Sequence, residues 1–332
     1  MNATPLVWAI TIGVTVAFFV YEYFAHVRTP HTPSIGESAR WSVFYISLAL
    51  LFGVGIGIVS GWTFGGEYFA GYLTEKALSI DNLFVFLIIM SGFAVPKEHQ
   101  QKVLMIGIII AIVLRGIFIA VGAALIDNFS WVFYVFGALL LVLAYNQAFG
   151  SHESDPANGR AVKLMRRILP ITDDYHGGSF AVRVDGKRFF TPLLLVIIAI
   201  GVVDLVFAVD SIPAIYGLTE EAYIVFTANV FALMGLRQLY FLIGGLLERL
   251  VYLAQGLAVI LGFIGVKLVL HALHINELPF VNGGQGVDWA PEIPIWFSLT
   301  FIGATVAVAT VASLIKTSGN TVTDPATPSK QG

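Results

Sequence analysis

Four carboxylates stand inside long apolar stretches of this 332-residue chain, and their type and spacing point to chemistry. Glu75 and Asp81 are six residues apart, and Asp204 and Asp210 repeat that spacing. A carboxylate within a lipid bilayer costs several kcal/mol unless it is paired or hydrated, so acids of this kind mark ion or proton pathways. The sequence therefore predicts a metal site formed by these four acids.

Neutral oxygen donors accompany the acids. Asn82 follows Asp81, Ser211 follows Asp210, and Asn229 lies in the next apolar stretch, so these three are possible additional ligands. The chain has no cysteine, which excludes thiolate metal sites and disulfides. Oxygen-rich ligand sets suit magnesium, calcium or manganese. No resident cofactor is expected; the cation is a transported substrate.

Two arginines, Arg115 and Arg237, share the apolar surroundings of the acids. Four acids against two arginines leave a formal charge of −2, which one divalent cation or two protons would neutralise. Each arginine is interpreted as a structural counter-charge that holds a carboxylate through a bidentate hydrogen bond. Six residues of a straight helix rotate by about 600°, so the acids of a pair point some 120° apart. Pro213 is expected to permit a helix break that frees backbone carbonyls as ligands.

The composition places most of the chain in lipid. Hydrophobic residues make up 57% of the sequence and charged residues 12%, with a mean hydropathy of +0.84. A soluble domain carries far more charge, so soluble and nucleic-acid-binding classes are excluded and the bilayer is the expected solvent. No Lys or Arg precedes Arg28, so the first apolar run lacks the basic region of a signal peptide and is interpreted as a retained span.

The expected fold is all-α, a polytopic membrane protein of about nine transmembrane helices. A span needs about 20 mostly apolar residues. Nine stretches qualify: 4–24, 42–63, 70–95, 103–126, 130–149, 191–213, 222–245, 252–273 and 294–316.

The distribution of charge predicts the orientation. With the N-terminus outside and the C-terminus in the cytoplasm, fourteen of the eighteen Lys and Arg residues fall in cytoplasmic segments and none in external loops. An inner (plasma) membrane location is expected. Glu22 is expected at the cytoplasmic surface. The loop 150–190 is interpreted as a solvated connector with a short amphipathic helix at 161–168, and the tail 317–332 as disordered.

An internal repeat divides the chain. Arg115 and Arg237 both follow a leucine, both precede an aromatic residue by three positions, and both have a glycine seven positions later. Each repeat holds three helices, so the two must have opposite topology, as in many secondary transporters. The predicted organisation is two helices and a loop (1–63), a first repeat (64–149), the loop (150–190), an inverted repeat (191–273), an external loop with a last helix (274–316), and the tail (317–332).

The segment 204–214, Asp-Leu-Val-Phe-Ala-Val-Asp-Ser-Ile-Pro-Ala, resembles the TerC/Alx family of integral membrane proteins. Segments 75–86, 185–193 and 229–241 carry the same resemblance, which covers roughly residues 40–315. It implies a transporter related to the LysE superfamily, whose members are linked to manganese efflux, tellurite resistance and alkaline response. By position, the family's acidic motifs correspond to Glu75, Asp81, Asp204 and Asp210. One departure is Gly201, where the family often has an acid, which bears on metal choice.

Three functions are compatible with these features. The main hypothesis is an exporter of a divalent metal ion, manganese first, rather than an enzyme. A second is a scaffold or assembly factor in metal or tellurite stress resistance, and a homo-oligomer or membrane partner proteins are compatible with either. The third is an intramembrane aspartyl protease, but Ile80 stands where such enzymes have tyrosine, and the residues before Asp204 read Gly-Val-Val rather than Gly-x-Gly.

Overall fold

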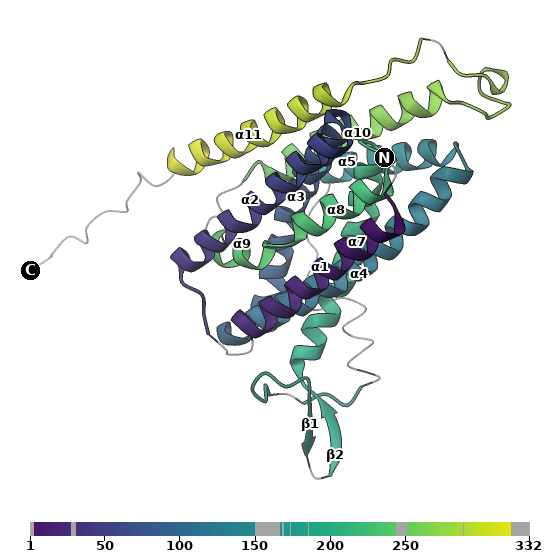
Figure 1. Cartoon of the computed structure of the whole chain (residues 1–332). Helices are drawn as coiled ribbons and strands as arrows, with labels where there is room; N and C mark the ends of the chain where they lie inside the picture. The colour runs from purple at the N-terminus through teal and green to yellow at the C-terminus, as the bar shows by residue number, and fades with distance from the viewer. Residues whose placement is uncertain are drawn as a thin grey trace, which may run out of the picture.

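The computed structural model describes residues 3–27, 31–149, 167, 169–172, 174–184, 186–243, 251–287 and 289–319. Long helices dominate this part of the chain, as Figure 1 shows. They are α1 (Pro5–Glu22), α2 (Ile35–Ser60), α3 (Trp62–Gly92), α4 (Lys97–Asn128), α5 (Val132–Phe149), α7 (Pro192–Tyr216), α8 (Ala222–Leu233), α9 (Leu236–Ile243), α10 (Leu253–His274) and α11 (Ile295–Gly319). A π-helical turn, Tyr23–Val27, extends α1, and Asn282–Gly284 form a short 3-10 helix.

Eight helical segments of the described chain are long and apolar enough to cross a membrane. They correspond to eight of the nine predicted spans. The remaining predicted span, 70–95, lies in α3. This helix is 31 residues long, but Glu75, Lys76 and Asp81 interrupt its apolar sequence. At 1.5 Å per residue α3 extends for about 46 Å, which exceeds the thickness of a hydrocarbon core. The all-α polytopic fold is therefore confirmed, and α3 carries charged residues in its middle third.

The contacts between the long helices pair off in a regular way. α3 packs against α8, and α4 packs against α7 in the same way. The third helices of the two repeats, α5 and α10, form the most extensive helix pair of the structure. A β-carbon on Gly137 of α5 would lie 2.7 Å from the Val269 side chain and 3.0 Å from the carbonyl oxygen of Gly265, both on α10, so the glycine permits a close approach of the two helices. Exchanging α3, α4 and α5 for α7, α8 and α10 leaves this contact pattern unchanged.

The structure has a helix break between α8 and α9, whereas the sequence predicted one in α7. α7 runs through Pro213 to Tyr216, so the predicted break at this proline is wrong. Pro213 lacks the N–H for one i→i−4 hydrogen bond, but α7 continues for three residues beyond it. The predicted span 222–245 is broken instead, at Met234 and Gly235 between α8 and α9. Gly235 has a φ of +85°, a conformation that favours glycine.

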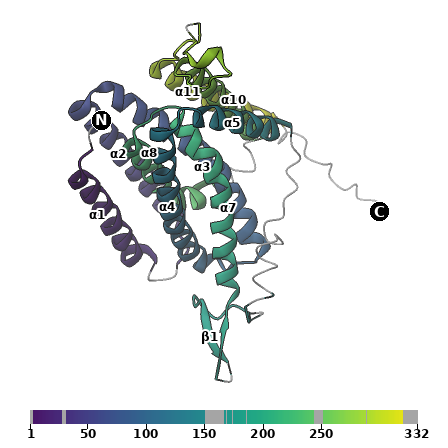
Figure 2. The same ribbon diagram turned by 90° about the vertical axis from the view of Figure 1, so that its right-hand side faces the viewer.

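Helix α1 lies at the edge of the bundle, as Figure 2 shows. Its Thr11 hydroxyl is 2.8 Å from the Tyr223 hydroxyl of α8. The indole of Trp8 packs against the rings of Tyr223 and Phe226, with ring centroids 5.2 and 5.3 Å apart. Near its other end Glu22 supplies a second attachment, described below. Helix α11 packs on α3 and α10.

A small β-hairpin projects from the end of the bundle where α7 begins (Figure 1). The sequence predicted a solvated connector in this region and no strands. Its strands are β1 (Ala181–Val184) and β2 (Lys187–Phe190). The segment before the hairpin is anchored to the bundle: the Tyr175 hydroxyl donates to the Phe93 carbonyl at 2.6 Å, and the Lys102 ammonium donates to the Gly178 carbonyl at 2.7 Å. The predicted helix 161–168 falls, apart from Arg167, outside the described residues, as does the tail beyond 319.

Candidate functional site

A buried ion cluster at the interface of the two repeats is centred on Arg115 of α4. Its Nη1 donates to Glu75 Oε1 of α3 and, at 3.0 Å, to Asn229 Oδ1 of α8. Its Nε and Nη2 donate to the two carboxylate oxygens of Asp204 on α7, at 3.3 and 3.2 Å. All four side chains are at most 2% exposed. One guanidinium therefore binds one predicted acid from each repeat, and its contact with Asp204 is bidentate as expected.

Neutral groups complete the hydrogen bonds of this cluster. Ser79, one turn after Glu75 on α3, donates to that carboxylate at 3.4 Å, and the Asn229 amide approaches its other oxygen at 3.5 Å. With the Asn82 amide rotated by 180°, its oxygen accepts from Arg115 Nη2 at 3.3 Å. Ser79 was not among the predicted residues, although its spacing of four from Glu75 is the helical signal that could have identified it.

A small cavity of about 30 Å³ lies next to Asn82, between α3, α5, α7 and α10. Ser211 and Gln147 also line it, and the Ser211 hydroxyl is buried without a hydrogen-bond partner. The space is sufficient for one or two water molecules or a small cation, and its polar lining favours such an occupant. The sequence proposed Asn82 and Ser211 as ligands, and both line this cavity. Gln147 was missed; it is an amide within an otherwise apolar span.

The predicted acids separate into two groups. Glu75 and Asp204 meet at Arg115, whereas the side chains of Asp81 and Asp210 lie outside the described part of the structure. Their chain neighbours Asn82 and Ser211 line the cavity. Among the side chains that are described, no three His, Asp or Glu residues stand close enough to hold one metal ion. The described part of the proposed site is thus an arginine-bridged carboxylate pair beside a polar cavity.

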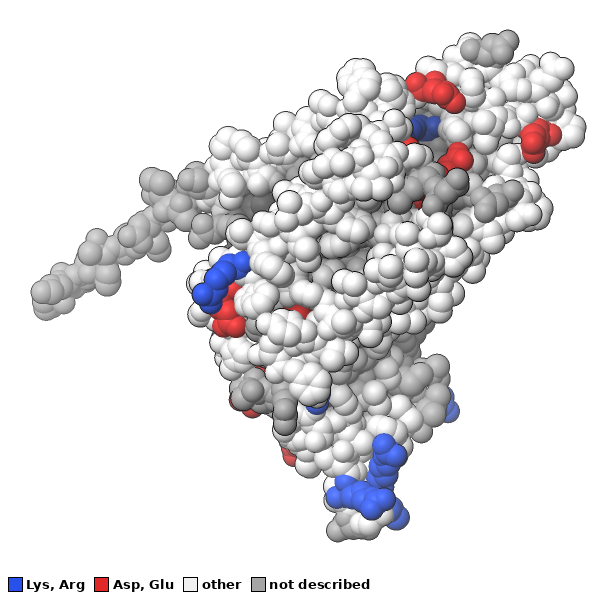
Figure 3. Space-filling view, in the orientation of Figure 1, with Lys and Arg blue, Asp and Glu red and all other residues white. Residues whose placement is uncertain are grey.

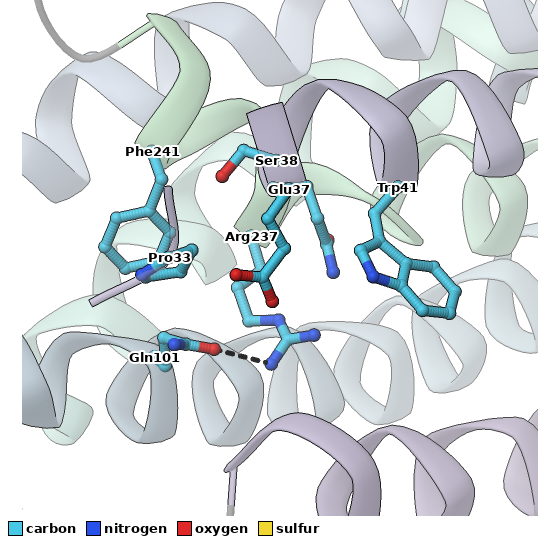
Figure 4. Close-up of a pocket in the computed structure, with 8 residues that line it drawn as sticks. Pro33, Glu37, Ser38, Trp41, Gln101, Arg237 and Phe241 are labelled. Carbon is cyan, nitrogen blue, oxygen red and sulfur yellow. Dashed lines mark hydrogen bonds between the residues drawn. The ribbon is translucent and has the colours of Figure 1, made fainter. Parts of the chain in front are cut away.

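Arg237 belongs to a different cluster, centred on Glu22. Its Nη2 donates to Glu22 Oε1 at 2.9 Å, and its Nη1 donates to Gln101 Oε1 at 3.1 Å, the contact drawn in Figure 4. The hydroxyl of Tyr45 and, at 3.1 Å, the amide of Gln238 also donate to Glu22. This cluster ties α1, which lies outside the repeats, to α2, α4 and α9.

Two expectations are corrected by this cluster. Glu22 was expected at the membrane surface, but its side chain is buried because Arg237, Gln238 and Tyr45 supply donors inside the bundle. Arg237 was counted against the four predicted acids, but its partner is Glu22. Four carboxylates against Arg115 alone give the predicted metal site a formal charge of −3 instead of −2.

A larger cavity of about 580 Å³ lies at the end of the bundle opposite the hairpin, and acidic side chains gather at this end (Figure 3). The His271 ring nitrogen lies 2.9 Å from the Glu220 carboxylate. This hydrogen bond lowers the pKa of Glu220 below its usual range, against the opposing effect of partial burial. Lys267 also lines the cavity. The acids that line it are Glu67, Glu220, Glu221 and Glu292.

Comparison with known proteins finds several similar membrane proteins. Over 318 residues the chain is 49% identical to an uncharacterized membrane protein of Mycobacterium tuberculosis, covering 94% of this chain and 80% of the relative. An uncharacterized membrane protein of Myxococcus xanthus is 36% identical, covering 94% and 93%. An Escherichia coli protein, named "Putative membrane-bound redox modulator Alx", is 40% identical, covering 80% and 86%. No solved structure matches this chain.

The model of one protein family, described as the integral membrane protein TerC family, matches residues 60–321. This range includes both repeats, the Arg115 cluster and the cavity beside it. It begins after α1 and α2, so Glu22 lies outside the matched segment while its partner Arg237 lies within it. The chain belongs to the TerC family of integral membrane proteins.

Proposed function

We propose that this protein is a transporter that exports a divalent metal ion, with manganese as the first candidate. The observation that carries the proposal is the convergence of Glu75 and Asp204 on Arg115 at the interface of the two repeats. Two buried carboxylates with a single counter-charge form an electronegative centre inside the membrane, and secondary transporters place their substrate sites at such interfaces.

The chemistry of the surrounding groups supports a hard divalent cation. Carboxylate, amide and hydroxyl oxygens are the donors that Mn²⁺ prefers. We assign the metal ligands to Glu75, Asp81, Asp204 and Asp210, with Asn82, Ser211 and Asn229 as further oxygen donors. Arg115 holds two of the carboxylates when the cation is absent. Binding of the cation then requires those two carboxylates to exchange the guanidinium for a metal ion, so each of them has a positive partner both before and after binding.

Transport by purified protein tests the proposal. In liposomes containing the full chain, Mn²⁺ movement across the membrane is expected for the wild type. We expect Asp81→Asn and Asp204→Asn to lower the rate by roughly 10–100-fold or more, since even partners outside the ligand shell have effects of that size. Glu98→Gln is a matched control, because Glu98 is an exposed acid at the start of α4. Wild-type rates in either aspartate variant would remove the metal site from the proposal.

We propose that the N-terminus lies outside and the C-terminus in the cytoplasm of a cell whose inner membrane holds the protein. The basic side chains of the hairpin end and the acidic side chains of the opposite end support it (Figure 3). A topology reporter inserted at Gly283, in the exposed segment between α10 and α11, is expected to report the outside, and one at the C-terminus the cytoplasm. The opposite pair of signals would contradict the proposed orientation.

Other functions find less support. An aspartyl protease needs two aspartates that share one proton, whereas Asp204 accepts two hydrogen bonds from an arginine. The redox role in the name of the Escherichia coli relative would need chemistry other than thiol exchange here, because the chain has no cysteine. If the protein were instead a scaffold in metal or tellurite stress resistance, Asp81→Asn would leave that resistance intact, whereas a transporter would lose it.

A further inference from the structure

The β-hairpin presents two arginines side by side. In the register of β1 and β2, Arg183 lies directly opposite Arg188, so both side chains project from one face of the hairpin. Residues in such a pair have β-carbons about 5 Å apart. Both arginines are exposed. The Arg188 guanidinium also lies over the Phe190 ring, 5.8 Å from the ring centroid. Like charges directly opposite one another repel, so this face of the hairpin carries a concentrated positive charge.

The hairpin is held close to the membrane surface. Strand β2 ends at Phe190, and Pro192 is the first residue of the spanning helix α7. Arg188 precedes Pro192 by four residues, so the two are separated by at most about 13 Å of extended chain. The 25 residues of α7 extend for about 37 Å, longer than a hydrocarbon core of about 30 Å, so the helix ends reach the headgroup layer.

The anchoring contacts restrict where the arginines can reach. The segment before β1 is bound to the start of α4 through Lys102 and to the end of α3 through Phe93. In addition, Thr191 donates to the carbonyls of Phe180 and Ser179, at 3.0 and 2.6 Å, which closes the base of the hairpin. The base of the hairpin is therefore fixed to the bundle, close to the first residue of α7.

We propose that Arg183 and Arg188 together bind the phosphate group of an anionic phospholipid of the surrounding bilayer. A guanidinium binds phosphate oxygens in a bidentate manner, and two opposed guanidinium groups supply donors on both sides of one phosphate. A lipid headgroup is the source that the geometry favours, because the pair is fixed within a few residues of a membrane span. This inference does not depend on which ion the protein transports.

Native mass spectrometry of the full-length protein in detergent tests the proposal, with phosphatidylglycerol and phosphatidylcholine as probes. The wild type is expected to retain phosphatidylglycerol in preference to phosphatidylcholine. The double variant Arg183→Gln/Arg188→Gln is expected to retain phosphatidylglycerol more weakly, by roughly tenfold or more. Lys187→Gln is the matched control. Lys187 is equally exposed and adjoins Arg188, but its side chain projects from the opposite face of the hairpin, so this variant is expected to bind as the wild type does.

Three results would overturn the proposal. They are equal retention of the two lipids by the wild type, unchanged retention of phosphatidylglycerol by the double variant, and an equal loss in Lys187→Gln. Inorganic phosphate distinguishes a lipid from a free anion: if phosphate alone displaces phosphatidylglycerol at equal concentration, the site takes free anions. Since both arginines are exposed, the double variant is expected to unfold at the wild-type temperature in detergent without lipid, which excludes misfolding as a cause.

Discussion

Arg115→Leu is expected to lower the stability of the protein more than any other single substitution in the bundle. The change leaves Glu75 and Asp204 buried without a counter-charge. Breaking one buried ion pair by removal of a partner costs roughly 3–5 kcal/mol, and here one arginine serves two carboxylates. The Tm of the detergent-purified protein and its abundance in membranes measure the effect. Arg40→Leu is the control, because Arg40 is exposed on α2.

Neutralising the partners separates stability from transport in this cluster. Combining Arg115→Leu with Glu75→Gln and Asp204→Asn removes the uncompensated charges, so abundance and Tm are expected to recover most of the loss. Metal transport is expected to stay absent, because two proposed ligands are gone. An Arg115→Leu protein with unchanged Tm would mean that water solvates the two carboxylates, contrary to the burial described here.

Arg237→Leu is expected to lower the stability of the protein by the second largest amount. Because its partner is Glu22, the added substitution Glu22→Gln is expected to restore that stability. Alone, Arg237→Leu leaves Glu22 with only Tyr45 and Gln238 as described donors, at a cost of roughly 3–5 kcal/mol. Adding Glu22→Gln removes the unpaired charge, and the Tm is expected to return close to the wild-type value. Transport is expected to return as well, because neither residue belongs to the proposed metal site.

A double-mutant cycle gives this expectation a sharp test. Directly coupled residues show interaction energies of about 0.5–3 kcal/mol, whereas distant residues add independently. Arg237→Leu is therefore expected to couple to Glu22→Gln and to add independently to Asp204→Asn. Coupling to Asp204 instead would place Arg237 in the metal pathway and contradict the separation into two clusters.

The sequence predicts the helices and the acids well because both depend on local composition. A run of about 20 apolar residues is sufficient to identify a span, and a carboxylate inside such a run stands out without knowledge of its partner. The pairing of Arg115 with Glu75 and Asp204 needs the packing of α3, α4 and α7, which no local pattern specifies. Glu22 illustrates the limit, because its partner is 215 residues away.

The helix break shows a second limit. Pro213 is the stronger local breaker, yet α7 continues through it and ends three residues later. Gly235 breaks the predicted span 222–245 because helix α2 packs against it: a β-carbon there would lie 3.0 Å from the Tyr45 β-carbon. The deciding contact comes from a different helix. The hairpin was missed because the four-residue strands β1 and β2 are too short to show a clear alternation of polar and apolar residues.

The separation of Glu22 and Arg237 along the chain also orders events during synthesis. At about 5–20 residues per second, Arg237 leaves the ribosome roughly 10–40 s after Glu22. Throughout that interval α1 carries a carboxylate whose arginine does not yet exist. The nascent helix must therefore keep Glu22 in contact with water or other polar groups at the edge of the insertion machinery until α9 has been made. Helix α1 is thus synthesised well before α9, yet it reaches its final packing only once α9 is present.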